Sequence, residues 1–244
     1  MFSSSSSSPF FNYFDGTYII NLAERSDRRR EMIQEFRRFG MTDLPTKAEF
    51  FTAVKPSNPG KFPSLGARGC FMSHLGVLQA AKAQNLDQIL LLEDDATFTK
   101  NLVRYQTQLL HELQIIPWDF AYFGHHLATD TDFLLQSYNQ PIVQAHFLAI
   151  HSRIFDRLIG FLETILDRPA GHPEGGPMHV DGAYSTFRKQ NPDINTVVAS
   201  IPLGFQRSSR SSIANQSWFD ALPVTTNMVS LARRVKNLYR NVTV

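Results

Sequence analysis

Three consecutive carboxylates, Glu93, Asp94 and Asp95, follow an apolar segment, residues 88–92. Adjacent like charges repel one another unless something positive lies among them. A divalent cation is the natural counter-charge, and oxygen ligands favour Mn²⁺ or Mg²⁺. Because alternate side chains of an extended segment share a face, we expect Glu93 and Asp95 to point together at a metal and a diphosphate. Asp94 is then expected in a hydrogen-bond network, and the alternative for all three acids is a solvated turn.

A basic segment, Arg25-Ser26-Asp27-Arg28-Arg29-Arg30, follows a second apolar segment, residues 17–22. A helix N-terminus with adjacent arginines is a ready anion site, suited to the phosphates or the ribose of a nucleotide. Only one or two of these arginines can face inward on a helix. A solvated helix face is the alternative for most of them.

Three polar or reactive residues interrupt an otherwise apolar helical pattern over residues 66–84: Cys70, Ser73 and His74. Ser73 and His74 either line a pocket or satisfy each other and the backbone. Cys70, in apolar company, is expected to be an inert packing thiol. It is the single cysteine of the chain, which excludes an internal disulfide framework and any Cys-rich zinc site.

Strand-like and helix-like segments alternate along the chain, which predicts an α/β sandwich with a largely parallel central sheet. Ligands of such sheets collect beyond the carboxyl ends of the strands, where the acid triplet lies. Glycines at 66, 69 and 76 are unfavourable inside a helix and predict close backbone packing there. The predicted strands cover residues 17–22, 50–54, 88–92, 120–123, 145–150 and 196–199, and the predicted helices cover 26–39, 66–84, 100–113, 152–165 and a segment that starts at Asp181.

The composition is that of a folded protein and argues against some partners. Of 244 residues, 43% are hydrophobic, and the net charge is +2, less basic than a protein that binds nucleic acid by neutralising phosphates. We therefore expect no nucleic-acid partner. No stretch approaches the ~20 apolar residues of a membrane span.

Both ends of the chain differ from the middle. Residues 1–15, with six serines and no basic n-region, are expected to be a disordered leader, so the expected location is cytoplasmic. Residues 214–244 form a basic amphipathic tail or helix. It is expected either to lie on an anionic membrane as a peripheral contact at its inner face, or to pack as an ordinary terminal helix.

Taken together, in this order and spacing, three motifs resemble glycosyltransferase family 25, which includes bacterial lipopolysaccharide galactosyltransferases and collagen galactosyltransferases. They are Tyr18–Leu22 with the arginines after it, Gly66–His74 beside the family pattern Gly-Glu-x-Gly-Cys-x-x-Ser-His, and Leu91–Asp95. The resemblance extends to Val180-Asp181 and to the region near Gln206-Arg207, over residues 16–213 in all. One departure is Ala67, which stands where the family commonly has Glu.

The resemblance implies a GT-A-type, Rossmann-like fold over residues 16–213. It also implies metal-dependent transfer of a hexose, usually galactose, from a UDP-sugar to a hydroxyl acceptor, with inversion. The expected acceptor is a glycan or glycolipid such as a lipopolysaccharide or surface glycan, and the acid triplet plays the part of the DxD motif. Two alternatives are a non-catalytic GT-A-like module that binds nucleotide sugar or a membrane surface, and nucleotidyl transfer.

Site roles follow from the same resemblance. Glu93 and Asp95 are expected to hold Mn²⁺ or Mg²⁺. Asp181 is the first candidate for the base that takes the acceptor proton, with an N-cap as its alternative role, and Asp94 is the second candidate. Seven residues are expected at the donor: Asn21, Leu22, Arg25, Arg28, Ser73, His74 and Glu93.

Overall fold

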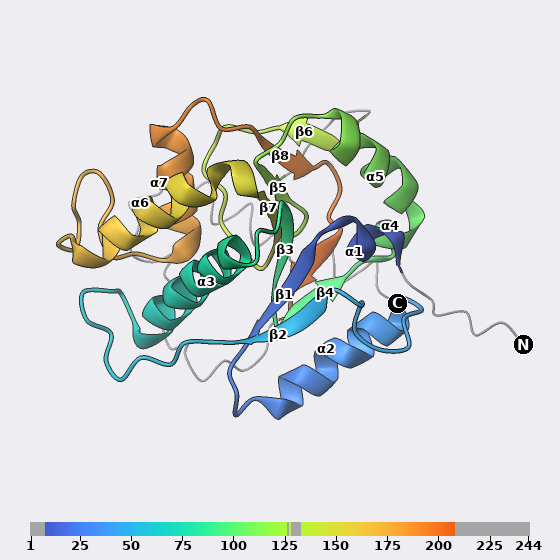
Figure 1. The fold of residues 1–244 in the computed structure, drawn as a ribbon, viewed down its shortest axis with the longest axis horizontal. Coiled ribbons are helices and arrows are strands. Elements are labelled where there is room, and N and C mark those ends of the chain that lie inside the picture. Colours follow the sequence, from blue (N-terminus) through green and yellow to red (C-terminus); the bar gives the residue numbers. More distant parts are fainter. Residues whose placement is uncertain (1–7, 126, 128–132, 208–244) are drawn as a thin grey trace, which may run out of the picture. The chain divides into compact units, whose positions relative to one another are not determined.

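The computed structural model describes residues 8–125, 127 and 133–207 (Figure 1). These belong to a compact unit that reaches Ser209, and a second unit covers Arg210–Val244. The predicted tail of residues 214–244 lies outside the described residues, so its helix and its membrane contact stay predictions. Within the described ranges, no helix combines the length and the apolar character needed to cross a bilayer.

A seven-stranded sheet forms the centre of the described unit. Strands β1, β2, β3, β5 and β8 run in one direction, whereas β7 and β6 run against them. This confirms the predicted α/β fold with a largely parallel sheet, and the reversed strand β7 lies near its middle. The order across the sheet is β2 (Ala48–Thr52), β1 (Gly16–Asn21), β3 (Gln88–Glu93), β7 (Phe147–His151), β5 (Phe120–Tyr122), β8 (Thr196–Ala199) and β6 (Leu135–Ser137).

Helices cover both faces of this sheet, which explains why its strands are continuous apolar runs. In β3, Ile89 and Leu91 belong to one buried cluster, and Leu90 and Leu92 belong to the other. The first cluster includes side chains of α3 (Leu65–Ala83), α6 (Phe155–Asp167) and α7 (Val180–Gln190), and the second includes those of α1 (Pro9–Tyr13), α2 (Ser26–Arg38), α4 (Lys100–Arg104) and α5 (Gln106–Ile115).

Residues 8–15 correct the prediction of a disordered leader. Pro9–Tyr13 form helix α1, and Phe10, Phe11 and Phe14 are buried. The ring of Phe10 packs edge-on against Phe123, with the centroids 5.3 Å apart. The aromatic residues thus have partners in the second cluster, and burying them offsets the entropy lost when the segment becomes ordered.

Two glycines let α3 pack closely on the edge of the sheet. A Cβ atom on Gly69 would lie 2.8 Å from the main-chain oxygen of Val54, and one on Gly76 would lie 3.0 Å from Cζ of Phe51. Close packing is therefore confirmed at these two positions. It brings the middle of α3 beside the carboxyl end of β3.

Several short elements were not predicted. The helix expected over 100–113 is divided into α4 and α5 around Tyr105. A single 3₁₀ turn, η1 (Ser152–Ile154), precedes α6. Strands β4 (Ala96–Phe98) and β9 (Gly204–Gln206) form a separate antiparallel pair, in which Ala96 lies opposite Gln206. This pair carries residues from near position 206 to the acid triplet.

Candidate functional site

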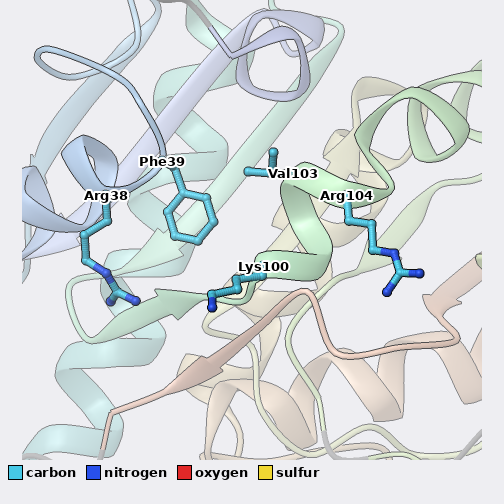
Figure 2. A pocket seen from close by; sticks show the side chains of 5 residues that line it. All are labelled: Arg38, Phe39, Lys100, Val103 and Arg104. Atoms are coloured by element: carbon cyan, nitrogen blue, oxygen red, sulfur yellow. The ribbon is translucent and has the colours of Figure 1, made fainter. Parts of the chain in front are cut away.

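A surface hollow of about 470 Å³ lies between the end of α2 and α4, away from the predicted chemistry. Figure 2 shows its lining, in which basic side chains surround an aromatic ring. None of the residues predicted to act on a ligand lines it; the lining consists of Arg38, Phe39, Lys100, Val103 and Arg104. The candidate site is instead defined by the acid triplet.

The acid triplet begins at the last residue of β3, in register with the carboxyl end of β1. Glu93 lies opposite Ile20 of β1. Asp94 is 7% exposed and Asp95 is 8% exposed. The alternative of a solvated acidic turn is therefore wrong, because two of the three carboxylates are withdrawn from water.

Asp94 forms the predicted hydrogen-bond network. Its Oδ2 accepts a 2.7 Å hydrogen bond from Nδ2 of Asn21, and its Oδ1 lies 2.6 Å from Nη1 of Arg28. The main-chain oxygen of Asp94 accepts a hydrogen bond of 2.8 Å from Nη2 of Arg207. Asp94 thus joins the ends of β1 and β3 to α2. Arg28 supplies part of the positive charge that we had expected a cation to supply.

Glu93 and Asp95 point together as expected, but β3 ends at Glu93, and a turn at Asp94 and Asp95, not the alternation of an extended segment, brings them together. Nε2 of Gln206 lies 3.4 Å from Oε2 of Glu93 and 3.2 Å from Oδ2 of Asp95. Arg28 approaches the same Asp95 oxygen at 3.6 Å. The other oxygen of Asp95, Oδ1, is buried and accepts no hydrogen bond within the described part of the chain. Two carboxylates therefore converge on one amide nitrogen, with one oxygen left unsatisfied.

The pKa values of these two acids move in opposite directions. Burial raises the pKa of Asp95 to about 7, and the charge of Glu93 adds to this, while Arg28 and Gln206 oppose it. Burial also raises the pKa of Glu93, but His74, whose Nε2 lies 3.5 Å from Oε1, outweighs it, so that this pKa lies below its usual value. A like charge beside a buried acid favours such a split, in which one acid ionises more readily than the other.

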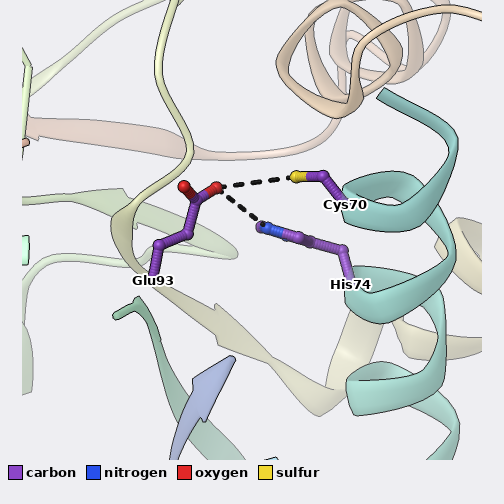
Figure 3. Close-up of side chains that lie close together, drawn as sticks. All are labelled: Cys70, His74 and Glu93. Atoms are coloured by element: carbon purple, nitrogen blue, oxygen red, sulfur yellow. Dashed lines mark hydrogen bonds and ion pairs between the residues drawn. The ribbon is translucent and has the colours of Figure 1, made fainter. Parts of the chain in front are cut away.

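The second oxygen of Glu93 faces α3 (Figure 3). Its Oε1 lies 3.5 Å from Nε2 of His74 and accepts a weak 3.6 Å hydrogen bond from the thiol of Cys70. Nδ1 of His74 lies 3.1 Å from the hydroxyl of Tyr184 on α7. Cys70 packs against the core cluster as expected, and its thiol in addition points at a carboxylate. Burial raises the pKa of Cys70 well above its usual value, and the charges of Glu93 and Asp181 raise it further.

Two predicted donor residues do not point into this cluster. Ser73 is fully buried, and its hydroxyl donates to the carbonyl of Gly69 at 2.6 Å and accepts from the main-chain nitrogen of Val54 at 2.8 Å. The bond to Gly69 lies within α3, and the bond from Val54 holds α3 to the loop after β2, so Ser73 satisfies the backbone and its place at the donor stays a prediction. The guanidinium of Arg25 is engaged by the carboxylate of Asp27 at 2.7 and 2.9 Å rather than by the triplet.

Leu22 and Asp181 flank the cluster without contacting its carboxylates directly. Leu22 is half-buried just after β1, where its carbonyl accepts the main-chain N–H of Arg25 at 2.9 Å. Asp181 is the second residue of α7 and accepts from the main-chain nitrogens of Gln144 at 3.1 Å and Gly182 at 2.8 Å. The N-cap of α7 is His179, so the N-cap alternative for Asp181 is wrong.

Ala67, the departure from the family pattern, lies in the first turn of α3. Ser64 is the N-cap of α3, and its side chain accepts the main-chain N–H of Ala67 at 3.0 Å. A Glu three residues after a serine N-cap can return a hydrogen bond to the cap, as in a capping box. Ala67 is therefore in the place of a helix-capping residue, not beside the triplet.

Three site residues were missed: Gln206, Arg207 and Tyr184. Gln206 and Arg207 reach the triplet because β9 pairs with β4, directly after Asp95. The sequence offered one signal for these two residues: the family resemblance extended to the region near Gln206 and Arg207. Tyr184 had no signal of its own, since one tyrosine in an amphipathic helix is typical of a core position.

Comparisons with known proteins agree with the motifs. Residues 14–156 match the family model described as "Glycosyltransferase family 25 (LPS biosynthesis protein)". A solved structure titled as a glycosyltransferase involved in the glycosylation of the major capsid of PBCV-1 is 10% identical with a TM-score of 0.49, and the alignment covers 80% of this chain and 94% of that one.

Curated relatives match about half of the chain. A glycosyltransferase 25 family member from Aedes aegypti is 31% identical over 137 residues, 47% of this chain and 22% of the relative. Procollagen galactosyltransferase 1-B from Xenopus laevis is 31% identical over 129 residues, 46% of this chain and 21% of the relative. A probable inactive glycosyltransferase 25 family member 3 from Bos taurus is 26% identical over 129 residues, 46% of this chain and 22% of the relative.

The alignments thus span only about a fifth of the length of these relatives. The family-model match, by contrast, covers more than half of this chain and includes the triplet together with Asn21, Arg28, Cys70 and His74. The chain belongs to glycosyltransferase family 25.

Proposed function

We propose that this chain binds a UDP-sugar at the acid triplet and transfers its hexose, galactose by family habit, to a hydroxyl of a glycan or glycolipid, with inversion. One observation carries the proposal: Glu93 and Asp95 converge on Nε2 of Gln206, and Oδ1 of Asp95 is buried without a hydrogen bond from any described residue. Burying a carboxylate without enough hydrogen bonds or positive charge costs folding free energy, and such carboxylates are typical of functional sites.

The residues fit a hard divalent cation, Mn²⁺ or Mg²⁺. Oε2 of Glu93 and the carboxylate of Asp95 would hold it, because both lie on one face and both offer oxygen. A bound cation would supply positive charge that stabilises the departing diphosphate. Asn21 and Arg28 support this arrangement indirectly, by fixing Asp94 between the two ligands.

For the base, the contacts favour Asp181 over Asp94. Both carboxylates accept hydrogen bonds through both oxygens, but Asp94 is buried and paired with the charged guanidinium of Arg28, whereas the partners of Asp181 are main-chain N–H groups. Asp181 is only partly buried, on a helix beside the same cluster. In the proposed step, the acceptor hydroxyl gives its proton to the Asp181 carboxylate and its oxygen attacks the anomeric carbon. The bond from that carbon to UDP breaks as the new bond forms on the opposite side.

The test is release of UDP from UDP-galactose by this chain with Mn²⁺, compared between Asp95→Asn and Asp156→Asn. Asp156 is an exposed acid that pairs with Lys82 on the far side of α3, so its variant controls for charge. We expect Asp95→Asn to lose at least about 100-fold in rate, in line with the loss of a metal ligand, and Asp156→Asn to match the wild type. Equal rates in all three proteins would contradict the proposal.

A second candidate, a non-catalytic nucleotide-sugar-binding module, rests on Arg28. This arginine already neutralises Asp94 and approaches Asp95, and some relatives of similar identity are named inactive. Such a module would show a UDP-sugar-dependent rise in melting temperature, because a bound ligand stabilises the folded state by mass action, without any release of UDP. Measuring UDP release and the UDP-sugar-dependent melting temperature on the same protein therefore separates the two candidates.

A further inference from the structure

We propose that Cys70, His74 and Glu93 form a binding site for Zn²⁺ on the α3 side of the triplet. Cys70 and His74 are four residues apart on α3, so both side chains lie on one face of the helix. Glu93 meets them from the end of β3, and one ligand atom of each residue lies within 4.8 Å of the others (Figure 3). Thiolate, imidazole and carboxylate are the three ligand types that Zn²⁺ uses in proteins.

The distances fit a tetrahedral ion. With Zn–S bonds of about 2.3 Å and Zn–N and Zn–O bonds of about 2.0–2.2 Å, tetrahedral geometry sets neighbouring ligand atoms about 3.4–3.6 Å apart. Oε1 of Glu93 lies 3.6 Å from Sγ of Cys70 and 3.5 Å from Nε2 of His74. Two of the three distances between ligand atoms therefore already match those around a tetrahedral ion. The third, from Sγ to Nε2, lies below 4.8 Å.

His74 provides a second, independent observation. Its side chain is fully buried, and Nε2 makes no hydrogen bond within the described residues while it faces Glu93. Its other nitrogen, Nδ1, lies 3.1 Å from the hydroxyl of Tyr184. Metal-binding histidines are typically oriented in this way, by a partner on the nitrogen that does not bind the ion. When Zn²⁺ binds, the Cys70 thiol loses its proton to solvent and the Nδ1–H of His74 donates to Tyr184.

The site differs in chemistry from the proposed Mn²⁺ or Mg²⁺ site. Sulfur and nitrogen ligands favour Zn²⁺, whereas oxygen-only ligands favour harder ions. Glu93 offers Oε1 to Cys70 and His74, and it offers Oε2 toward Gln206 and Asp95. The two sites thus share one carboxylate but use different oxygens. Zn²⁺ binding itself does not depend on the proposed transferase activity.

The experiment is Co²⁺ titration of the purified chain without nucleotide, followed by displacement with Zn²⁺. Cys70 is the only cysteine, so a sulfur-to-cobalt charge-transfer band in the near ultraviolet reports on this site alone. We expect one sulfur-ligated Co²⁺ per chain, with visible bands of a tetrahedral ion that disappear when Zn²⁺ is added. Cys70→Ser should abolish the charge-transfer band, and His74→Gln should weaken binding at least about 10-fold.

Two control variants match these changes. His111→Gln removes an exposed histidine of α5 and should leave the titration unchanged. Asp95→Asn should keep the cobalt spectrum even if it loses UDP release, which separates failure of this proposal from failure of the proposed function. The absence of a charge-transfer band in the wild type, or its persistence in Cys70→Ser, would overturn the proposal.

A second measurement covers the case in which Cys70→Ser does not fold. In the wild-type chain, Zn²⁺ should slow alkylation of the single thiol by iodoacetamide at least about 10-fold, and a chelator should restore the rate. An alkylation rate that Zn²⁺ does not change would overturn the proposal as well.

Discussion

Glu93 separates two regions of unlike chemistry. On the α2 side lie two more carboxylates, two arginines and two amide side chains, joined by hydrogen bonds and ion pairs. On the α3 side lie a thiol, an imidazole and a phenol within an apolar cluster, joined by longer contacts of 3.1–3.6 Å. The first region is organised around carboxylate oxygens, and the second region around a sulfur, an imidazole and a phenol.

The two regions shift the pKa of a buried carboxyl group in opposite directions. Toward α3, His74 favours the ionised form of Glu93 and holds its pKa below the usual value. Toward α2, burial and the neighbouring charge raise the pKa of Asp95 to about 7, although Arg28 lies nearby. Arg28 therefore does not fully compensate the charges of Asp94 and Asp95, and the pKa of Asp95 stays raised.

The largest expected effect is that of Glu93→Gln, because it affects both regions at once. We expect UDP release to fall at least about 100-fold and the affinity for Co²⁺ to fall at least about 10-fold, since one ligand of each ion is weakened. The measurements are the UDP-release assay and the cobalt titration on the same preparation. Asp95→Asn and Cys70→Ser are the matched one-sided variants. If Glu93→Gln lowers only UDP release or only the affinity for Co²⁺, the two proposed ion sites do not share the Glu93 carboxylate.

Arg28→Ala should have the next largest effect, on stability. Its guanidinium and the carboxylate of Asp94 are only 13% and 10% exposed, and they lie 2.6 Å apart. Removing one partner leaves an uncompensated buried charge next to Asp95, which costs about 3–5 kcal/mol. Urea unfolding should show this loss in the free energy of unfolding. Arg157→Ala, which breaks an exposed pair with Asp193, should cost at most about 1 kcal/mol; equal losses would contradict the account of Arg28.

The α2 side was largely predictable from the sequence. Three acids after a buried strand predicted that Glu93 and Asp95 would point together, and they do, although a turn at Asp94 and Asp95, not a continued strand, brings them together. The network around Asp94 followed as well. The partners were harder to assign: of four candidate arginines, the sequence did not single out the one that meets Asp94, because the answer depends on how α2 lies across the end of β1.

The α3 side was not predictable, because it depends on contacts distant in sequence. The orientation of Cys70 depends on how deeply α3 packs, which Gly69 and Gly76 permit. The hydroxyl of Tyr184 reaches His74 across 110 positions of sequence. Gln206 arrives only through the pairing of β9 with β4, two strands too short to be recognised from periodicity. The ordered segment around Phe10 was missed for the same reason, since its partners lie on distant elements.

The pH dependence of stability should distinguish the two acids. Because the folded-state pKa of Asp95 is raised from 3.8 to about 7, the native state retains a proton that the unfolded state has already lost. The free energy of unfolding should therefore fall as the pH rises from about 5 to about 7 in the presence of a chelator, by at most about 1.4 kcal/mol for each pH step of one. Glu93, whose pKa is lowered, contributes only below this range. Urea unfolding of Asp95→Asn should show a flatter profile; a slope identical to the wild type would contradict the assignment to Asp95.

Tyr184→Phe should have the smallest effect, confined to the α3 side. It removes only the hydroxyl beside Nδ1 of His74 and keeps the ring that packs against Phe120. One lost hydrogen bond costs about 1 kcal/mol, and losing the group that orients a metal-binding histidine costs about 10-fold in affinity. The cobalt titration should record that loss while the wild-type UDP-release rate is retained. Tyr105→Phe, which changes a tyrosine packed against the opposite core cluster, is the matched control and should bind Co²⁺ as the wild type does. A fall in UDP release without a change in the cobalt titration would place the hydroxyl of Tyr184 with the α2 side instead, and would remove the distinction between the two regions.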